Sequence, residues 1–110
     1  MSLVKTIEVT ELAEMKEKDN AVRVIDIRNP AELNRGIIPG SEALPMHTIP
    51  LRINEFKRDE TLIMVCLSGA RSAQACMYLQ QQGYDNVFNL RGGMMAWANN
   101  GFELGLPQAI

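Results

Sequence analysis

Short apolar runs alternate with segments of helical pattern along the chain. Four runs are rich in β-branched and apolar residues and predict strands: TIEV (6–9), VRVIDI (22–27), TLIMV (61–65) and NVFNL (86–90). A shorter strand is predicted around Ala43-Leu44. Apolar strands separated by helices indicate a parallel sheet whose two faces are both covered. The pattern therefore predicts an α/β domain of three layers.

Helical patterns fill the segments between these runs, over residues 11–18, 31–35, 49–56, 72–82 and 94–100. Thr10, Asn29 and Thr48 stand before the first three helices, where they are placed to begin them. Gly83 follows the fourth helix at the position of a C-terminal stop. The segment 102–110 has no clear pattern.

Length and composition indicate one globular domain, spanning residues 1–110 with a core of about 6–101 and a C-terminal tail of 102–110. The net charge is −2 without a basic cluster, which argues against nucleic-acid binding. No apolar stretch approaches the roughly 20 residues that cross a bilayer, and no export signal is visible. Two cysteines without such a signal indicate a reducing cytoplasm.

The clearest candidate chemistry lies where the strand TLIMV ends on Cys66. Function in parallel α/β sheets gathers at the carboxyl ends of the strands. The short loop that follows, Leu67-Ser68-Gly69-Ala70, contains a glycine and can turn successive N–H groups inward around an anion. A helix beginning near Arg71 would add partial positive charge at the same place. The pattern predicts a cradle for the Cys66 sulfur.

Typical interaction energies indicate which part of this cradle would stabilise a thiolate most. A helix dipole contributes roughly 0.3–1 kcal/mol, whereas each hydrogen bond to a charged group contributes about 1.5–3 kcal/mol. Several N–H donors therefore outweigh the dipole, and Arg71 is expected to add a fixed charge. The result would be a stabilised, nucleophilic thiolate. The alternative for an isolated cysteine at a strand end is that it serves as a small core residue.

Metal chemistry is not indicated by the sequence. The chain has one histidine, and its two cysteines stand ten positions apart, so neither a CxxC pair nor a His–His pair is present. We expect no metal and no cofactor.

Two stretches together resemble the rhodanese family. The first is VCLSGARSAQACMYLQQQGYDNVFNLRGGMMAW (65–97), and the second is VIDIRNPAELNRGIIPGSEALP (24–45). The resemblance covers nearly the whole chain and implies a rhodanese-like fold, with a five-stranded parallel sheet between helices. It also implies a sulfurtransferase whose Cys66 carries a persulfide. The donor would be thiosulfate, polysulfide, glutathione persulfide or a sulfur-relay protein, and the acceptor a thiol or, in the assay, cyanide.

Two positions depart from the family pattern. Ile37 stands where the family usually has a histidine before its IPG segment, so any hydrogen bond from that histidine is lost. Leu67 follows Cys66 where some members carry a basic residue that favours thiosulfate. A loop whose only cation is Arg71 weakens the case for thiosulfate and favours a protein persulfide as the physiological donor.

Several further residues are assigned supporting roles. Asp26 and Arg28 end a strand expected beside the catalytic one, and we expect them to buttress the loop through salt bridges; substrate contact is an alternative for Arg28. Ser72 is expected to cap the helix or to bond the loop. Cys76 lies on the buried stripe of that helix, where core packing is favoured over a resolving thiol. Trp97 is expected to be a packing anchor.

Two other classes of function remain as alternatives. Phosphatases of related architecture, and arsenate reductases, would need the wider Cys-x5-Arg loop, whereas Cys66 and Arg71 form the shorter Cys-x4-Arg. A non-enzymatic regulatory module is the other alternative, but inactive members of the family typically lack the cysteine that this chain retains.

Overall fold

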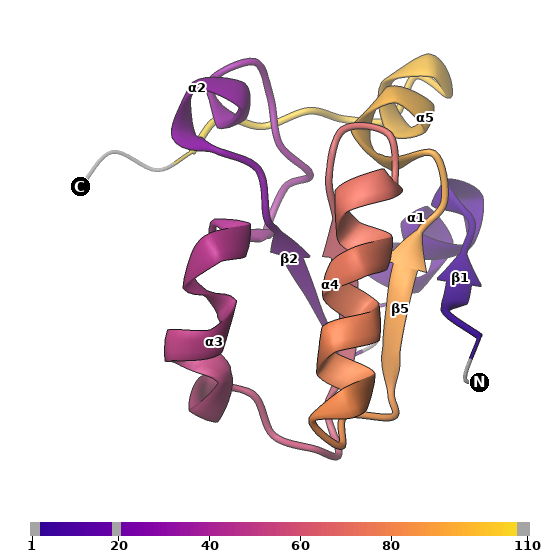
Figure 1. Ribbon diagram of the computed structural model, residues 1–110. Coiled ribbons are helices and arrows are strands. Elements are labelled where there is room, and N and C mark those ends of the chain that lie inside the picture. The colour runs from indigo at the N-terminus through magenta and orange to yellow at the C-terminus, as the bar shows by residue number, and fades with distance from the viewer. Residues whose placement is uncertain (1–2, 19–20, 108–110) are drawn as a thin grey trace.

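The computed structural model describes residues 3–18 and 21–107 and shows a parallel sheet between two layers of helices (Figure 1). The five strands lie in the order β1-β5-β4-β2-β3, and every pairing is parallel. Their bounds are β1 Lys5–Ile7, β2 Val22–Asp26, β3 Glu42–Ala43, β4 Thr61–Val65 and β5 Val87–Leu90. The predicted five-stranded α/β architecture is confirmed.

Alternate side chains of the central strand β4 point to opposite faces of the sheet, and both faces are buried. The helices are α1 Val9–Glu17, α2 Pro30–Leu33, α3 Ile49–Arg52, α4 Ala70–Gln81 and α5 Gly93–Asn99. Leu62 and Met64 pack with α3 and α4 residues, whereas Ile63 and Val65 pack with α1 and α5 residues. This double burial explains why the strand is apolar throughout.

The start of α1 differs from the prediction, whereas α3 begins directly after Thr48 as predicted but without the side-chain cap. The strand β1 ends at Ile7 and α1 begins at Val9, so Thr10 lies inside the helix; Glu8 forms the cap, in a reciprocal arrangement with Glu11. The segment after Pro45 is a 3-10 turn (Met46–Thr48), then α3, then a second 3-10 turn (Ile53–Glu55). The Thr48 hydroxyl donates to the Pro45 carbonyl at 2.6 Å instead of capping α3.

The segment after α5 packs back onto the domain. Gly105 and Ile37 form an antiparallel bridge, with N–H···O distances of 2.9 and 2.8 Å. Trp97 is buried, its indole N–H donates to the Glu103 carbonyl, and its ring lies 4.9 Å from that of Phe102. Trp97 is therefore the packing anchor that was expected. Residues 108–110 of the expected tail lie outside the described residues.

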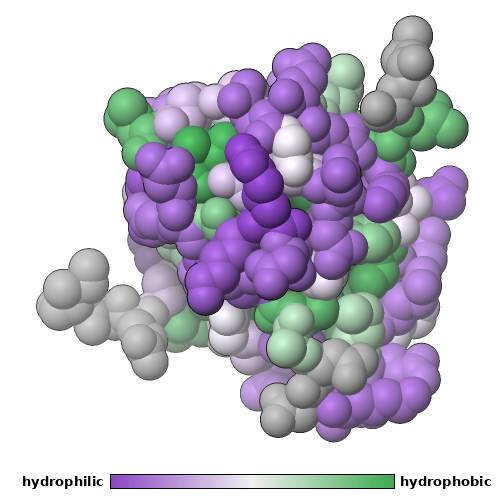
Figure 2. All heavy atoms as spheres, turned by 90° about the horizontal axis from the view of Figure 1, so that it is seen from below, coloured by the Kyte–Doolittle hydropathy of each residue, from purple (hydrophilic) through white to green (hydrophobic). Residues whose placement is uncertain are grey.

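The carboxyl ends of the strands all face one edge of the sheet, toward the loops at the top of Figure 1. Seen from the opposite side, at the amino ends of the strands, the surface is mostly hydrophilic with scattered apolar patches (Figure 2). Among the described helices, none is both long and apolar enough to cross a membrane.

Candidate active site

The loop after β4 brings Cys66 to the start of α4. Gly69 precedes the helix with φ +102°, a conformation that favours glycine, and α4 begins at Ala70, two residues earlier than predicted. Ser72 is thus the third residue of the helix and is fully buried. Because the loop is this short, the first turn of α4 lies beside the thiol.

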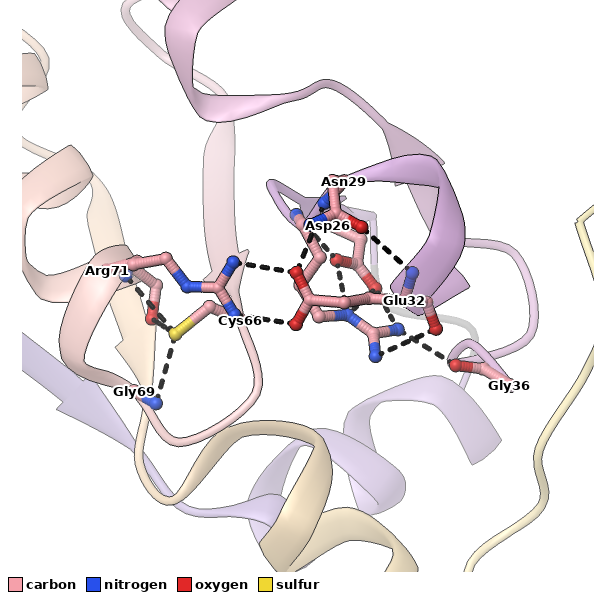
Figure 3. A network of polar contacts seen from close by, with 9 residues as sticks. Asp26, Asn29, Glu32, Gly36, Cys66, Gly69 and Arg71 are labelled. Carbon is pink, nitrogen blue, oxygen red and sulfur yellow. Dashed lines mark hydrogen bonds and ion pairs between the residues drawn. The ribbon is translucent and has the colours of Figure 1, made fainter. Parts of the chain in front are cut away.

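Three hydrogen bonds converge on the Cys66 sulfur (Figure 3). The backbone N–H groups of Gly69 and Ser72 donate to Sγ at 3.1 and 3.4 Å, and the Ser72 hydroxyl lies 3.2 Å from it. Burial of Cys66 opposes ionisation. The bonds from the Ser72 side chain and from the backbone of Ser72, Gly69 and Ser68 outweigh that effect, and the pKa of Cys66 lies below its usual value. The site therefore favours a thiolate.

Asn89 of β5 holds this loop in place. Its side-chain amide donates to the Gly69 carbonyl at 3.0 Å, and its oxygen accepts a short hydrogen bond from the Ser72 hydroxyl. Asn89 is nearly buried and faces the same side of the sheet as Val87. Sequence analysis missed it; the available signal was an amide inside the otherwise apolar run NVFNL.

The start of α5 contacts the other side of the loop. The backbone N–H groups of Met94 and Met95 donate to the carbonyls of Cys66 and Leu67 at 2.9 and 3.0 Å. A Cβ on Gly93, which has φ +55°, would collide with these two carbonyl oxygens. Gly93 therefore permits the close approach that fixes the backbone of Cys66, a role that sequence analysis did not assign.

The Arg71 side chain extends toward Glu32 of α2 (Figure 3). Its guanidinium forms a two-pronged ion pair with the Glu32 carboxylate, with both N–O distances at 2.8 Å. The hydrogen bond from Arg71 is the main cause that lowers the pKa of Glu32 to about 2. Arg71 was expected to add a fixed charge to the loop; the structure instead shows that charge compensated by Glu32, a partner that the sequence did not reveal.

Asp26 and Arg28 form a buried ion pair, at 2.8 Å between Nη2 and Oδ2. Arg28 also donates to the carbonyl of Gly36 at 2.8 Å and to that of Glu32 at 3.4 Å. The pair was expected to make salt bridges to the catalytic loop. Instead, its observed bonds join the end of β2 to α2 and the turn after it, so its link to the loop passes through Glu32 and Arg71.

The remaining candidate residues fall into two groups. Leu67 and Ser68 are exposed at the rim of the loop, with Leu67 43% accessible. Cys76 is fully buried on α4, and burial raises its pKa to about 12. Its environment is that of a packing residue. Among the described residues, no three His, Cys, Asp or Glu side chains gather in a way that could hold a metal ion.

The family is decided by comparison with known proteins. The family model described as Rhodanese-like domain matches residues 8–100. The chain belongs to the rhodanese-like sulfurtransferase family. A sulfurtransferase of Allochromatium vinosum is 45% identical over 106 residues, which cover 96% of this chain and 99% of the relative.

Two further relatives agree with this membership. The thiosulfate sulfurtransferase GlpE of Pseudoalteromonas translucida is 38% identical over 93 residues, covering 84% of this chain and 88% of the relative. The crystal structure of a rhodanese-like domain protein from Staphylococcus aureus superposes with a TM-score of 0.85 at 36% identity, covering 96% of this chain and all of that one. The rhodanese-like fold and the sulfurtransferase class are therefore confirmed.

Ile37 occupies the position where the family pattern usually has a histidine. Ile37 is half-buried, and its backbone bridges to Gly105. The position is thus tied to the segment after α5 rather than to the thiol loop.

Proposed function

We propose that this rhodanese-like domain carries sulfur as a persulfide on Cys66. The donor is thiosulfate or a low-molecular-weight or protein persulfide, and the acceptor is a thiophile: cyanide in the assay, a thiol or protein cysteine in the cell. The observation that carries the proposal is the convergence of the Gly69 and Ser72 N–H groups and the Ser72 hydroxyl on the sulfur.

The reaction needs a nucleophile and a place for negative charge. The Cys66 thiolate attacks the outer sulfur of thiosulfate, the sulfur–sulfur bond of the donor breaks, and its electron pair leaves with sulfite. Cys66 then carries a terminal sulfur that bears the charge. Attack by cyanide on this sulfur gives thiocyanate and restores the thiolate. The hydrogen bonds to the sulfur lower the pKa of Cys66, which raises the share of the nucleophilic thiolate.

The relatives and the charge of the loop support different parts of this proposal. The GlpE relatives act on thiosulfate by their printed names, which supports thiosulfate as one donor. The exposed neutral residue Leu67, together with the pairing of Arg71 to Glu32, supports persulfides as others.

Phosphatase chemistry is disfavoured by the same geometry. A phosphoryl group needs a wide ring of donors with a cation directed at its oxygens. Here the loop between Cys66 and Arg71 is short, and the Arg71 guanidinium is engaged by Glu32.

The test is thiocyanate formation from thiosulfate and cyanide. Cys66→Ala should abolish it without lowering the melting temperature substantially, whereas Cys76→Ser should retain most of the activity as the matched cysteine control. Equal loss from both substitutions would contradict the assignment of Cys66 as the sulfur carrier. Hydrolysis of phosphate esters by the unmodified protein would contradict the argument from loop size.

A further inference from the structure

Arg71 and Arg28 are each paired with a carboxylate, and this bears on which donors the site accepts. Glu32 opposes Arg71, and Asp26 opposes Arg28, each through a close ion pair. The exposed Arg35 is a further cation, and its side chain lines the neighbouring cleft. At the loop itself, Arg71 and Arg28 are thus both compensated, so the second charge of a doubly charged donor meets no free guanidinium from either residue.

Leu67, the residue that follows Cys66, lines a cleft of about 300 Å³. Its walls are mainly apolar, and the cleft shares Glu32 with the ion pair beside the thiol. The side chains that give it this character are Leu67, Met94, Met95, Ala98 and Leu104. Leu67, Met95 and Leu104 are 43%, 52% and 46% exposed, so they leave apolar surface that a ligand can cover.

We infer that this protein prefers a singly charged sulfur donor with an apolar organic group over thiosulfate, and that Glu32 sets this preference by pairing with Arg71. The organic group occupies the cleft between α2 and α5, which is lined by Leu67, the residue after Cys66. This inference rests on the proposed function and specifies the donor class for the same site.

The chemistry of such a donor balances without any further reactant. In methanethiosulfonate, a methyl group replaces one charged oxygen of thiosulfate. The Cys66 thiolate attacks its outer sulfur, the sulfur–sulfur bond breaks, and the electron pair leaves with methanesulfinate. For an organic persulfide, the same attack releases the thiolate of the donor. Thiosulfate and methanethiosulfonate are therefore a matched pair of probes that differ by one charge.

The charge is tested by the ratio of kcat/KM for methanethiosulfonate to kcat/KM for thiosulfate, with cyanide as acceptor. Glu32→Gln should lower this ratio at least about fivefold, because it leaves the charge of Arg71 uncompensated. The double variant Glu32→Gln/Arg71→Ala should return the ratio close to that of the parent. Gln keeps the oxygen that accepts from the Asn29 N–H, and both donors are measured on one preparation, so partial unfolding cancels from the ratio.

Glu55→Gln is the matched control. Glu55 also forms a two-pronged pair with an arginine, Arg52, at 2.8 Å, but it lies near the amino end of β2, where Arg23 donates to its carbonyl. Its substitution should leave the ratio unchanged.

The cleft is tested with benzenethiosulfonate, a larger donor of the same charge. Met95→Ser should lower kcat/KM for benzenethiosulfonate relative to methanethiosulfonate by about threefold, since less apolar surface is covered. Met77→Ser removes an equally exposed methionine from α4, outside the cleft, and should leave this ratio unchanged.

The possible outcomes separate this inference from the proposed function. A methanethiosulfonate-to-thiosulfate ratio that stays within about twofold in Glu32→Gln, while sulfur is still transferred, overturns the role of Glu32. An unchanged size ratio in Met95→Ser overturns the role of the cleft. Absence of transfer from every donor, with no sulfur on Cys66, overturns the proposed function itself.

Discussion

The Ser72 hydroxyl has one proton to donate and two acceptors, the Asn89 oxygen and the Cys66 sulfur. With a protonated thiol, the hydroxyl donates to Asn89 and accepts from the thiol. With a thiolate, it turns to the sulfur, and the Asn89 oxygen loses its donor. Replacing Ser72 with alanine removes this exchange and should raise the pKa of Cys66.

The size of the effect follows from the two bonds that are exchanged. The bond to the thiolate is worth about 1.5–3 kcal/mol and the neutral bond to Asn89 about 1 kcal/mol, which leaves a net of about 0.5–2 kcal/mol. At about 1.4 kcal/mol for each pKa unit, Ser72→Ala should raise the pKa of Cys66 by roughly one unit. Arg71→Ala should raise it by less than about half a unit, because Glu32 already compensates the guanidinium charge.

The assay is the pH dependence of Cys66 alkylation by iodoacetamide, measured in a Cys76→Ser background so that a single thiol reacts. Gly69→Val offers an independent disturbance of the backbone donors, because Gly69 has φ +102° and a Cβ there would lie 3.4 Å from the Gly92 nitrogen. A larger pKa rise in Arg71→Ala than in Ser72→Ala would refute the reasoning, since the guanidinium and not the hydrogen bonds would then stabilise the thiolate.

Three more perturbations test the scaffold around the thiol. The pKa of Glu32 falls from 4.5 to about 2 in the folded state. Glu32→Gln should therefore lower the free energy of unfolding by about 0.5–1 kcal/mol at neutral pH. Urea titrations should show this difference vanish as the pH falls from 4.5 to about 2. Asn89→Ala should lower the free energy of unfolding by about 1–3 kcal/mol and raise the pKa of Cys66, because the buried Gly69 carbonyl loses its donor. Gly93→Ala should destabilise more than Gly101→Ala, which has a similar positive φ but open space for a Cβ.

Each of these has a distinct contrary result. If the free energies of unfolding of Glu32→Gln and the parent differ by the same amount at every pH, the ion pair does not stabilise the fold. An Asn89→Ala variant with parental stability and alkylation profile would show that the loop holds its shape unaided. Equal melting temperatures for Gly93→Ala and Gly101→Ala would contradict the close approach of α5 to the loop.

The central strands were predictable because their signal is local. Both VRVIDI and TLIMV carry apolar side chains on both faces, and the structure buries both faces of β4. The same reasoning placed Cys66 at the carboxyl edge of the sheet. The start of α4 was placed two residues late, since Ala70 and Arg71 give no capping signal of their own and the helix begins after a glycine in a left-handed conformation.

The contacts that shape the site were not predictable, because each joins segments far apart in the sequence. Arg71 meets Glu32 across 39 positions, and Asn89 meets Gly69 across 20. An arginine in a loop can direct its charge at the thiol or at a carboxylate elsewhere, and its local sequence is the same in both cases. The sequence therefore could not show that Glu32 compensates the charge of Arg71. The backbone N–H donors to the Cys66 sulfur belong to a local loop and were expected.

The most direct test of the account is the intact mass of the Cys76→Ser variant after brief exposure to thiosulfate and removal of excess donor. The account predicts a gain of one sulfur atom, located on the peptide that contains Cys66, and its complete loss on addition of cyanide with one equivalent of thiocyanate formed. No gain in mass on Cys66 while thiocyanate still forms, or a gain that cyanide does not remove, would contradict transfer through a Cys66 persulfide.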